Sequence, residues 1–371
     1  MQTGSRAIGS TPSVLIIRPS SLGDIVHAMP IVHDLDEHLP GIPIDWVVEE
    51  TFAALVRLNG GVRRVIPVAL RRWRHELLAR STWQEFAAFR RELSHERYGA
   101  VRRVISVALR RWRYQLLARS TWHEFAAFRR ELSQERYDAV LDLQEQVKGA
   151  LIASFARGPV HGPDRRSVRE PIVTMLYRGR HRIEPRQHLI DRCRRLAGKA
   201  LGYEPAGAPR FGLVTPVAGE APESPYAVFL HATSRNDKLW PESHWRTLVE
   251  HAVNAGFTVL LPWGSVEEQA CSRRIAEGKS RSVIPPRQSL PELASLLARA
   301  VWVIGVDTGL THLAAALGAP TIAIFTATDP WLAGVARASP NARDLGGVGI
   351  VPSPQEVIRA IAPLVRAVPS C

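Results

Sequence analysis

The first residue whose type and position could do chemistry is Asp24, in the stretch "VLIIRPSSLGDIVHAMPIVHDL" that begins at Val14. An apolar run ends there in a short polar turn, and a helical pattern begins at Gly23 and Asp24. A carboxylate at a helix start commonly acts as an N-cap that accepts a hydrogen bond from a backbone N–H of the first turn. A corner at the end of a strand also suits a general base, so these residues alone leave both interpretations open.

A second candidate lies in the stretch "VWVIGVDTGLTHLAAALG", which ends a strand at Asp307. The helix that follows opens through Thr308, Gly309 and Leu310. Backbone N–H groups are free at a helix start, and a glycine allows close approach, so this turn could hold a phosphate. The alternative is an ordinary strand, turn and helix with an Asp or Thr cap.

Two further loops in the same half of the chain carry polar residues after apolar runs. "FLHATSRNDKLWP" contains Thr233, Ser234 and Lys238, and two hydroxyls with one ammonium group suit a diphosphate. "LLPWGSVEEQ" places Glu268 near a helix start, where its carboxylate could meet ribose hydroxyls or favour the helix dipole. Each loop could equally be solvated, but three polar loops at one sheet edge together indicate a ligand site.

Several other chemistries lack their motifs in this sequence. No GxGxxG follows the first strand and no Walker A motif is present, which argues against dinucleotide and nucleoside triphosphate binding. No Ser/His/Asp elbow and no Cys/His cluster appears. The three cysteines, Cys193, Cys271 and Cys371, are far apart, so we expect reduced thiols in a cytosolic protein.

The elements that must position these residues alternate as in parallel α/β sheets. The runs "SVLIIR", "PIDWVVEE", "RRVIPVAL" and "AVLDLQ" predict strands in the first half, and a second alternating series begins at "YAVFLHAT". We therefore predict two doubly wound domains over residues 14–204 and 225–371, joined by a linker at 205–224. Residues 1–13 are expected to be a loose tail, because they are too polar for a signal peptide.

One segment of the chain is written twice. Residues 63–101 and 102–140 are 39-residue blocks that differ at six positions, and each carries nine arginines against four acidic residues. The two blocks thus supply about +10 of the formal net charge of +13. Two copies are too few for a solenoid, so we interpret them as a tandem duplication within one domain. We expect a surplus segment, roughly 75–113, to lie outside the regular fold at the surface, since loop closure cost grows slowly with length.

Several stretches, taken in order and with their spacing, resemble the lipopolysaccharide heptosyltransferases of glycosyltransferase family 9. They are "SSLGDIVHAMP", "DWVVEE", "RRVIPVALRRWR", "YDAVLDLQEQVKGAL", "REP", "YAVFLHATSRNDKLWPESHW", "LPWG" and "VDTGLTHLAAALGAP". The resemblance implies a GT-B fold, in which two Rossmann-like domains face each other across a cleft. It implies an inverting transfer of heptose from ADP-heptose to a Kdo sugar of Kdo2-lipid A, with no metal or other cofactor.

The resemblance also assigns roles to individual residues. It makes Asp24 the general base that deprotonates the Kdo hydroxyl, with a pKa that burial in the closed complex is expected to raise. Contacts to the donor are implied at Thr233, Ser234, Lys238, Glu268, Gln288, Asp307, Thr308, Gly309, Leu310 and His312. Contacts to the acceptor are implied at Ser21, Gly23, Arg71, Arg72, Arg74, Lys148 and Arg169.

Two features complicate this transfer of roles. Arg110, Arg111 and Arg113 repeat the basic motif of the first copy, and we favour the first set because it continues from the regular upstream sequence. The chain also has "FTATDP", with Thr326 and Ala327, where the family tends to have Gly-Pro before Thr-Asp-Pro. This departure bears on the loop beside the donor sugar.

Rival functions remain open at this point. The chain could be a heptosyltransferase that acts on a heptose acceptor, a basic nucleic-acid-binding protein without activity, or an enzyme disabled by the duplication. No nucleic-acid-binding motif is present, so we expect no nucleic acid partner. We expect a cytoplasmic monomer that contacts the anionic cytoplasmic face of the inner membrane peripherally, because no apolar run reaches the length of a membrane span.

Overall fold

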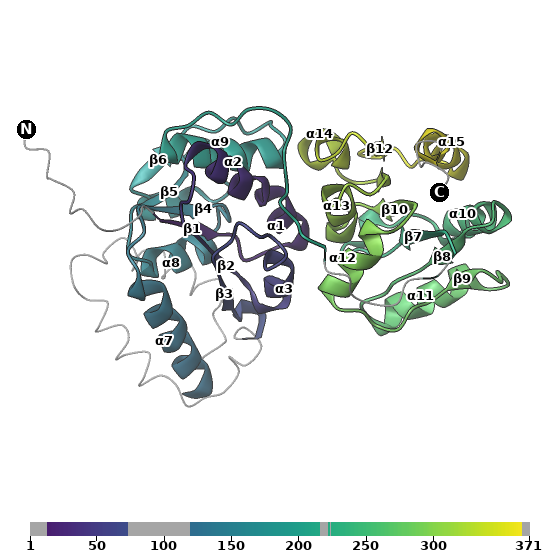
Figure 1. Ribbon diagram of the computed structural model, residues 1–371, viewed down its shortest axis with the longest axis horizontal. Helices are drawn as coiled ribbons and strands as arrows, with labels where there is room; N and C mark the ends of the chain where they lie inside the picture. Colours follow the sequence, from purple (N-terminus) through teal and green to yellow (C-terminus); the bar gives the residue numbers. More distant parts are fainter. Residues whose placement is uncertain (1–12, 73–118, 216–221, 223, 366–371) are drawn as a thin grey trace, which may run out of the picture.

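The computed structural model of the 371-residue chain describes residues 13–72, 119–215, 222 and 224–365. Within these residues the chain forms two α/β domains, each built on a six-stranded parallel sheet (Figure 1). The strand orders are β3-β2-β1-β4-β5-β6 and β12-β11-β10-β7-β8-β9. Both domains therefore have the same doubly wound order, and the two predicted Rossmann-like halves are confirmed.

The strands of the first domain are β1 (Val14–Ile17), β2 (Ile44–Glu49), β3 (Arg64–Val68), β4 (Ala139–Asp142), β5 (Val160–Pro163) and β6 (Gly179–His181). Its helices are α1 (Leu22–Ala28), α2 (Pro30–His38), α3 (Ala53–Val56), α7 (Arg119–Gln134), α8 (Val147–Phe155) and α9 (Leu189–Leu201), with short 3-10 turns η1 (Glu50–Phe52) and η3 (Pro171–Leu176). β1 is apolar throughout and fully buried, as a central parallel strand covered on both faces must be.

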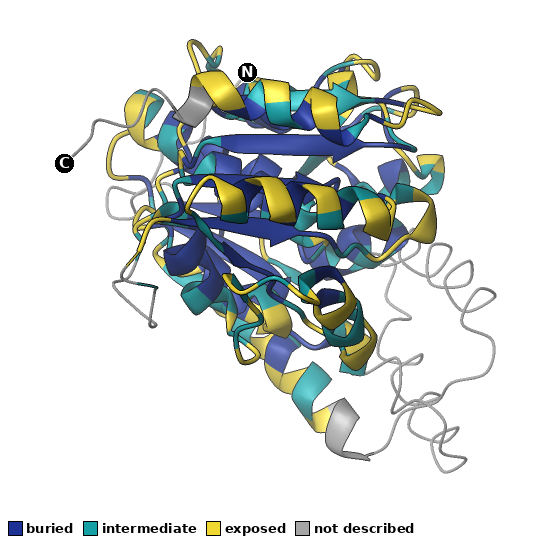
Figure 2. Ribbon diagram, turned by 90° about the vertical axis from the view of Figure 1, so that its right-hand side faces the viewer, coloured by how far each residue is buried: buried dark blue, intermediate teal, exposed yellow. Residues whose placement is uncertain are grey.

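The strands of the second domain are β7 (Tyr226–Leu230), β8 (Thr258–Leu260), β9 (Ser282–Val283), β10 (Trp302–Val306), β11 (Thr321–Phe325) and β12 (Ala342–Gly346). Its helices are α10 (Glu242–Asn254), α11 (Val266–Ala276), α12 (Leu290–Ala298), α13 (Gly309–Ala316), α14 (Pro330–Ala333) and α15 (Pro354–Val365), with 3-10 turns η4 (Asn236–Lys238) and η5 (Val335–Arg337). Figure 2 shows the buried strands between helices whose outer faces are exposed.

The duplicated segment contributes to the first sheet from both copies. β3 belongs to the first copy and lies beside β2 at the sheet edge, whereas α7 belongs to the second copy and β4 begins at its end. The regular places next to β2 and β1 are thus filled by the strands expected to fill them. The surplus segment expected at 75–113 lies outside the described residues.

The stretch between α9 and β7 runs back over the first domain before the second begins. α9 ends at Gly202, whose φ of 82° is the left-handed conformation that glycine adopts most easily. Farther on, Leu213 forms an antiparallel bridge with Asn59, and the Asn59 amide donates to the carbonyl of Phe211 at 2.9 Å. Part of the expected linker is therefore attached to the first domain.

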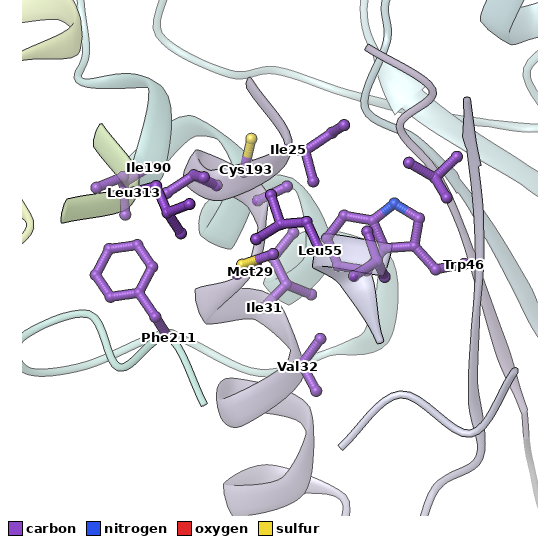
Figure 3. Packing of buried hydrophobic residues seen from close by; sticks show 14 of the residues in the cluster. Ile25, Met29, Ile31, Val32, Trp46, Leu55, Ile190, Cys193, Phe211 and Leu313 are labelled. Atoms are coloured by element: carbon purple, nitrogen blue, oxygen red, sulfur yellow. The ribbon is translucent and has the colours of Figure 1, made fainter. Parts of the chain in front are cut away.

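One apolar cluster continues from the first domain into the second. Ile25 and Met29 of α1, Ile190 of α9 and Leu313 of α13 all belong to it and are fully buried (Figure 3). Phe211 of the connecting stretch packs into the same cluster. At about 25 cal/mol per Å² of buried apolar surface, such a shared core fixes α1 against α13. The carboxyl ends of β1 and β10, where ligands bind in doubly wound sheets, are brought together as a result.

Candidate active site

The carboxylate of Asp24 is held by two neighbours in the turn between β1 and α1. Oδ2 accepts hydrogen bonds from the backbone N–H and the hydroxyl of Ser21 at 3.0 and 2.9 Å. Oδ1 lies 2.7 Å from the guanidinium of Arg18. Ser21 is therefore the N-cap of α1, and Asp24 is the acidic residue of its capping box. The interpretation of Asp24 as the N-cap itself is wrong by three positions.

The environment of Asp24 favours the ionised carboxylate. Burial acts to raise its pKa, but the Arg18 guanidinium and the Ser21 hydrogen bonds outweigh burial and lower the pKa from 3.8 to about 2. The sequence led us to expect that burial in the closed complex raises this pKa. In the structure burial acts in that direction, but a buried arginine against the same carboxylate outweighs it.

Arg18 was not among the residues selected from the sequence, although it directly follows the apolar residues of β1. Its guanidinium also donates to the carbonyl of Leu143 at the end of β4. Nearby, Lys148 at the start of α8 donates to the Ser20 hydroxyl at 2.8 Å, and burial lowers the pKa of this lysine. Two cationic side chains therefore lie beside the turn that carries Asp24.

The second group of residues converges on Asp307, at the end of β10. Its Oδ2 lies 2.6 Å from the Lys238 ammonium and accepts from the Thr328 hydroxyl at 2.5 Å, and its Oδ1 lies 3.3 Å from Nε2 of His312. The Thr233 hydroxyl donates to the Asp307 carbonyl at 3.1 Å. Burial opposes ionisation, but these partners hold the pKa of Asp307 well below its usual range. The loops after β7, β10 and β11 therefore meet at one carboxylate.

Thr328 was missed at the sequence level. It follows the departure at Thr326 and Ala327 in "FTATDP", and its bond to Asp307 gives this loop a direct connection to the site. The hydroxyl of Thr326 is bonded to the carbonyl of Asp237 at 2.9 Å, which attaches the same loop to the turn that holds Lys238.

The start of α13 lies against the start of α1 across the domain boundary. A Cβ on Gly309 would lie 2.6 Å from Cβ of Leu22 and 2.8 Å from the backbone nitrogen of Gly23. Real Cβ atoms do not approach other atoms so closely, so the contact needs glycine at position 309. Thr308 is the N-cap of α13. The turn that carries Asp24 and the turn proposed to hold a phosphate are thus in van der Waals contact.

The other donor-side candidates lie farther along the sheet edge. Ser234 is exposed on the loop after β7. Glu268 accepts from the Gly264 backbone N–H at 2.6 Å in the first turn of α11, so it serves the helix start. Gln288, just before α12, has a buried Oε1 without a hydrogen-bond partner among the described residues. A ribose or adenine contact of the last two side chains stays a prediction.

The acceptor-side arginines differ in their surroundings. Arg71 is exposed, with its guanidinium 5.1 Å from the centre of the Phe52 ring. Arg72 forms ion pairs with Glu50 and Glu124 at 3.2 and 2.8 Å. Arg169 is exposed, and the next residue, Glu170, accepts from the Val147 backbone N–H at the start of α8. Arg74, Arg110, Arg111 and Arg113 lie outside the described residues.

Two features are absent from the described part of the chain. Among residues 13–72, 119–215, 222 and 224–365, no group of three or more His, Cys, Asp and Glu side chains is arranged to hold a metal ion. No helix in the same ranges has the length and apolar character needed to cross a membrane.

Comparison with known proteins identifies several close resemblances. The family model "Glycosyltransferase family 9 (heptosyltransferase)" matches residues 125–348. The chain is 39% identical over 325 residues to lipopolysaccharide heptosyltransferase 1 of Salmonella typhimurium, covering 86% of this chain and 90% of that one. It is 37% identical over 327 residues to the Pseudomonas aeruginosa protein of the same name, covering 86% and 80%.

Solved structures agree in fold. The structure of E. coli heptosyltransferase WaaC with ADP has a TM-score of 0.79 and 35% identity, covering 95% of this chain and 99% of that one. The structure of E. coli ADP-heptose lps heptosyltransferase II has a TM-score of 0.68 at 19% identity, covering 95% and 98%, and supports the fold alone.

Proposed function

The chain belongs to glycosyltransferase family 9, the heptosyltransferases, and from that premise we propose that it transfers heptose from ADP-heptose to a Kdo hydroxyl of Kdo2-lipid A. Its fold is GT-B and its activity that of a heptosyltransferase. The proposal concerns the two substrates and the residues that act on them. The donor is supported by relatives solved with ADP and with ADP-2-deoxy-2-fluoro heptose, and the acceptor by the name of the relatives that match most of the chain.

The observation that carries the proposal is the contact between the starts of α1 and α13. It places Leu22 and Gly23, in the turn that carries Asp24, against Gly309 at the start of α13, and the Lys238 ammonium lies 2.6 Å from Asp307, two residues before Gly309. A sugar nucleotide whose diphosphate binds at Lys238 and the α13 start would present its sugar toward Asp24. A base on one side of the sugar carbon and cationic groups on the leaving-group side are what a single displacement needs.

The reaction then proceeds in one step with inversion. The Kdo hydroxyl oxygen forms a bond to the anomeric carbon, and the bond from that carbon to the β-phosphate oxygen breaks with its electron pair going to ADP. Lys238 and the N-terminal N–H groups of α13 stabilise the negative charge on ADP. The hydroxyl proton passes to Asp24, which keeps unused lone pairs although Ser21 and Arg18 contact both oxygens.

The low pKa of Asp24 determines when the proton moves. A weak base does not deprotonate the hydroxyl early in the reaction, while the hydroxyl is still only weakly acidic. The proton therefore transfers late, once the forming bond has made the attacking oxygen acidic. Lys148 and Arg71 supply cationic groups near this position for the carboxylates and phosphates of the acceptor.

Because the acceptor is a lipid, the enzyme has to work at a membrane surface, and we propose peripheral contact of the monomer with the anionic inner leaflet. Cosedimentation with vesicles of anionic lipid, compared with vesicles of neutral lipid, tests the contact. Light scattering tests the monomer.

The decisive experiment is mass spectrometry of Kdo2-lipid A after incubation with ADP-heptose and the full-length chain. We expect a gain of one heptose. Asp24→Asn should lower the rate by about 10²–10⁴-fold, as loss of a positioned base does. Asp36→Asn is the matched control, because Asp36 is an exposed carboxylate on α2. Transfer to a heptose-capped acceptor but not to Kdo2-lipid A would contradict the acceptor assignment.

A further inference from the structure

A row of polar side chains connects the donor loops to the helix that carries Asp24. The Lys238 ammonium lies 2.6 Å from Oδ2 of Asp307, and Oδ1 of Asp307 lies 3.3 Å from Nε2 of His312. Nδ1 of His312 in turn lies 3.3 Å from Nε2 of His27. His27 is on α1, three residues after Asp24 and hence on the same side of the helix. The row therefore begins in the second domain and ends one helical turn from the proposed base.

The chemistry of the row fixes where its protons lie. The ionised carboxylate of Asp307 can only accept hydrogen bonds, so Nε2 of His312 carries a hydrogen. Burial, together with the neighbouring His312 and His188, holds the pKa of His27 well below its usual range, so this ring is neutral. With the His312 hydrogen on Nε2, its Nδ1 is the acceptor that faces His27, and Nε2 of His27 is the donor to it.

The remaining nitrogen of His27 supports this arrangement. Nδ1 of His27 is buried and has no hydrogen-bond partner in the described part of the chain. With the hydrogen on Nε2, this Nδ1 is an unpaired acceptor. The opposite tautomer of His27 would leave its buried Nδ1–H without a partner. It would also place the bare Nε2 of His27 opposite the bare Nδ1 of His312, with no hydrogen between them. The bond from Nε2–H of His27 to Nδ1 of His312 is therefore the arrangement that satisfies most groups.

Other contacts across the boundary hold the two domains but do not reach Asp24. His188 of α9 lies with Nε2 2.9 Å from the carbonyl of Gly334, and Arg337 forms an ion pair with Asp191 at 2.7 Å. The His188 ring packs edge-on against the His27 ring, with centroids 5.7 Å apart. These contacts fix α9, whereas the His27 bond joins the donor loops to α1.

We infer that His27 is a positioning residue: its hydrogen bond to His312 sets the start of α1 against the assembled donor site, so that Asp24 lies in line with the sugar carbon. This inference rests on the proposed function. His27 is buried and its ring packs against His312 and His188, so its loss should affect the chemical step and not the binding of the nucleotide.

Three substitutions in the full-length chain separate this role from a packing role. His27→Leu keeps much of the volume and removes the donor. His27→Gln places an amide N–H near the position of Nε2, whereas His27→Asn places it near Nδ1 and cannot reach His312. We expect the Leu and Asn variants to lose kcat by about 10²-fold, the effect of a displacement of about 1 Å in a catalytic group. The Gln variant should recover most of kcat.

The readouts are kcat and KM for ADP-heptose, the Kd of ADP by calorimetry, and the melting temperature. In all three variants the Kd of ADP should stay within about twofold of the wild type. The matched control is His33→Leu, which should leave kcat unchanged. His33 lies on α2, and its ion pair within the described residues is with Glu37.

Three outcomes would overturn the inference. They are an unchanged kcat in His27→Leu, an equal loss of kcat in the Gln and Asn variants, and a weakened ADP affinity that accounts for the loss. Absence of heptose transfer by the wild type would instead count against the proposed function, which keeps the two failures distinct.

Discussion

Replacing Arg18 by glutamine should move the titration of Asp24 upward. The guanidinium lies 2.7 Å from Oδ1 of Asp24, and the exposed fractions of the two side chains are 5% and 21%. Lowering the pKa from 3.8 to about 2 corresponds to roughly 2.5 kcal/mol in favour of the ionised carboxylate, at about 1.4 kcal/mol per pKa unit. Without the guanidinium, burial is opposed chiefly by Ser21, so we expect the pKa of Asp24 to rise above 3.8.

The change has a defined consequence for stability. The folded-state pKa of Asp24 is lower than its unfolded value, so ionised Asp24 stabilises the fold above pH 4 and this contribution is lost as the pH falls from 3.8 toward 2. In Arg18→Gln the contribution is absent. Its free energy of unfolding at pH 7 should be lower by at least about 2.5 kcal/mol, and the difference should narrow below about pH 4. Urea unfolding followed by tryptophan fluorescence at several pH values measures this.

The pH dependence of kcat/KM tests the same reasoning at the site. The wild type should keep its activity on the acid side until the protein unfolds, whereas Arg18→Gln should lose activity at higher pH. Arg18→Lys keeps a positive charge and should stay close to the wild type, and Arg57→Gln controls for loss of an exposed arginine. The reasoning would be refuted if Arg18→Gln and the wild type lost kcat/KM at the same acidic pH and if the difference between their free energies of unfolding did not change with pH.

Three further predictions follow from the site and the repeat. Gly309→Ala places a Cβ 2.6 Å from Cβ of Leu22 and should lower kcat by about 10²-fold. The control Gly60→Ala, whose Cβ would lie 3.9 Å from its nearest neighbour, should leave kcat unchanged, and equal kcat values for the two variants in the transfer assay would contradict the prediction. Lys238→Ala should weaken ADP binding in calorimetry, and unchanged ADP affinity would argue against the diphosphate contact. The same variant should lower the free energy of unfolding by about 1.5–3 kcal/mol, because Asp307 loses its ammonium partner. Deletion of residues 75–113 should leave heptose transfer and the melting temperature close to those of the full chain, and a folded but inactive product would show that the surplus segment is needed.

The sequence predicted the architecture because the central strands are continuous apolar runs separated by helical patterns. β1 and β10 were found this way. The parallel pairing of each strand with its neighbours in its own sheet follows from the alternation with helices. The strands β5, β6 and β12 were not predicted. β5 and β6 are short and contain Gly, Pro or His, and β12 reads "ARDLG", so none has an apolar period.

The candidate site was predicted unevenly for a related reason. Local patterns such as a turn after a strand pointed to Asp24, Lys238 and Asp307, because their chain neighbours define those positions. Arg18 and Thr328 were missed because their importance comes from a contact with one specific carboxylate. The arginines of the repeat were selected from the family resemblance and their charge, and Arg72 proved to be ion-paired with Glu50 and Glu124.

By itself, the sequence determined the two doubly wound domains, the loops that carry chemistry and the family resemblance, because these depend on short-range periodicity and on motifs with fixed spacing. Only the tertiary structure decided that the turn of Asp24 meets the turn of Gly309, that Arg18 lowers the pKa of Asp24, and that His27 bonds to His312. The physical reason is that 285 positions of chain separate His27 from His312. A contact at that separation is set by how two domains pack, and no local pattern of residue types records it.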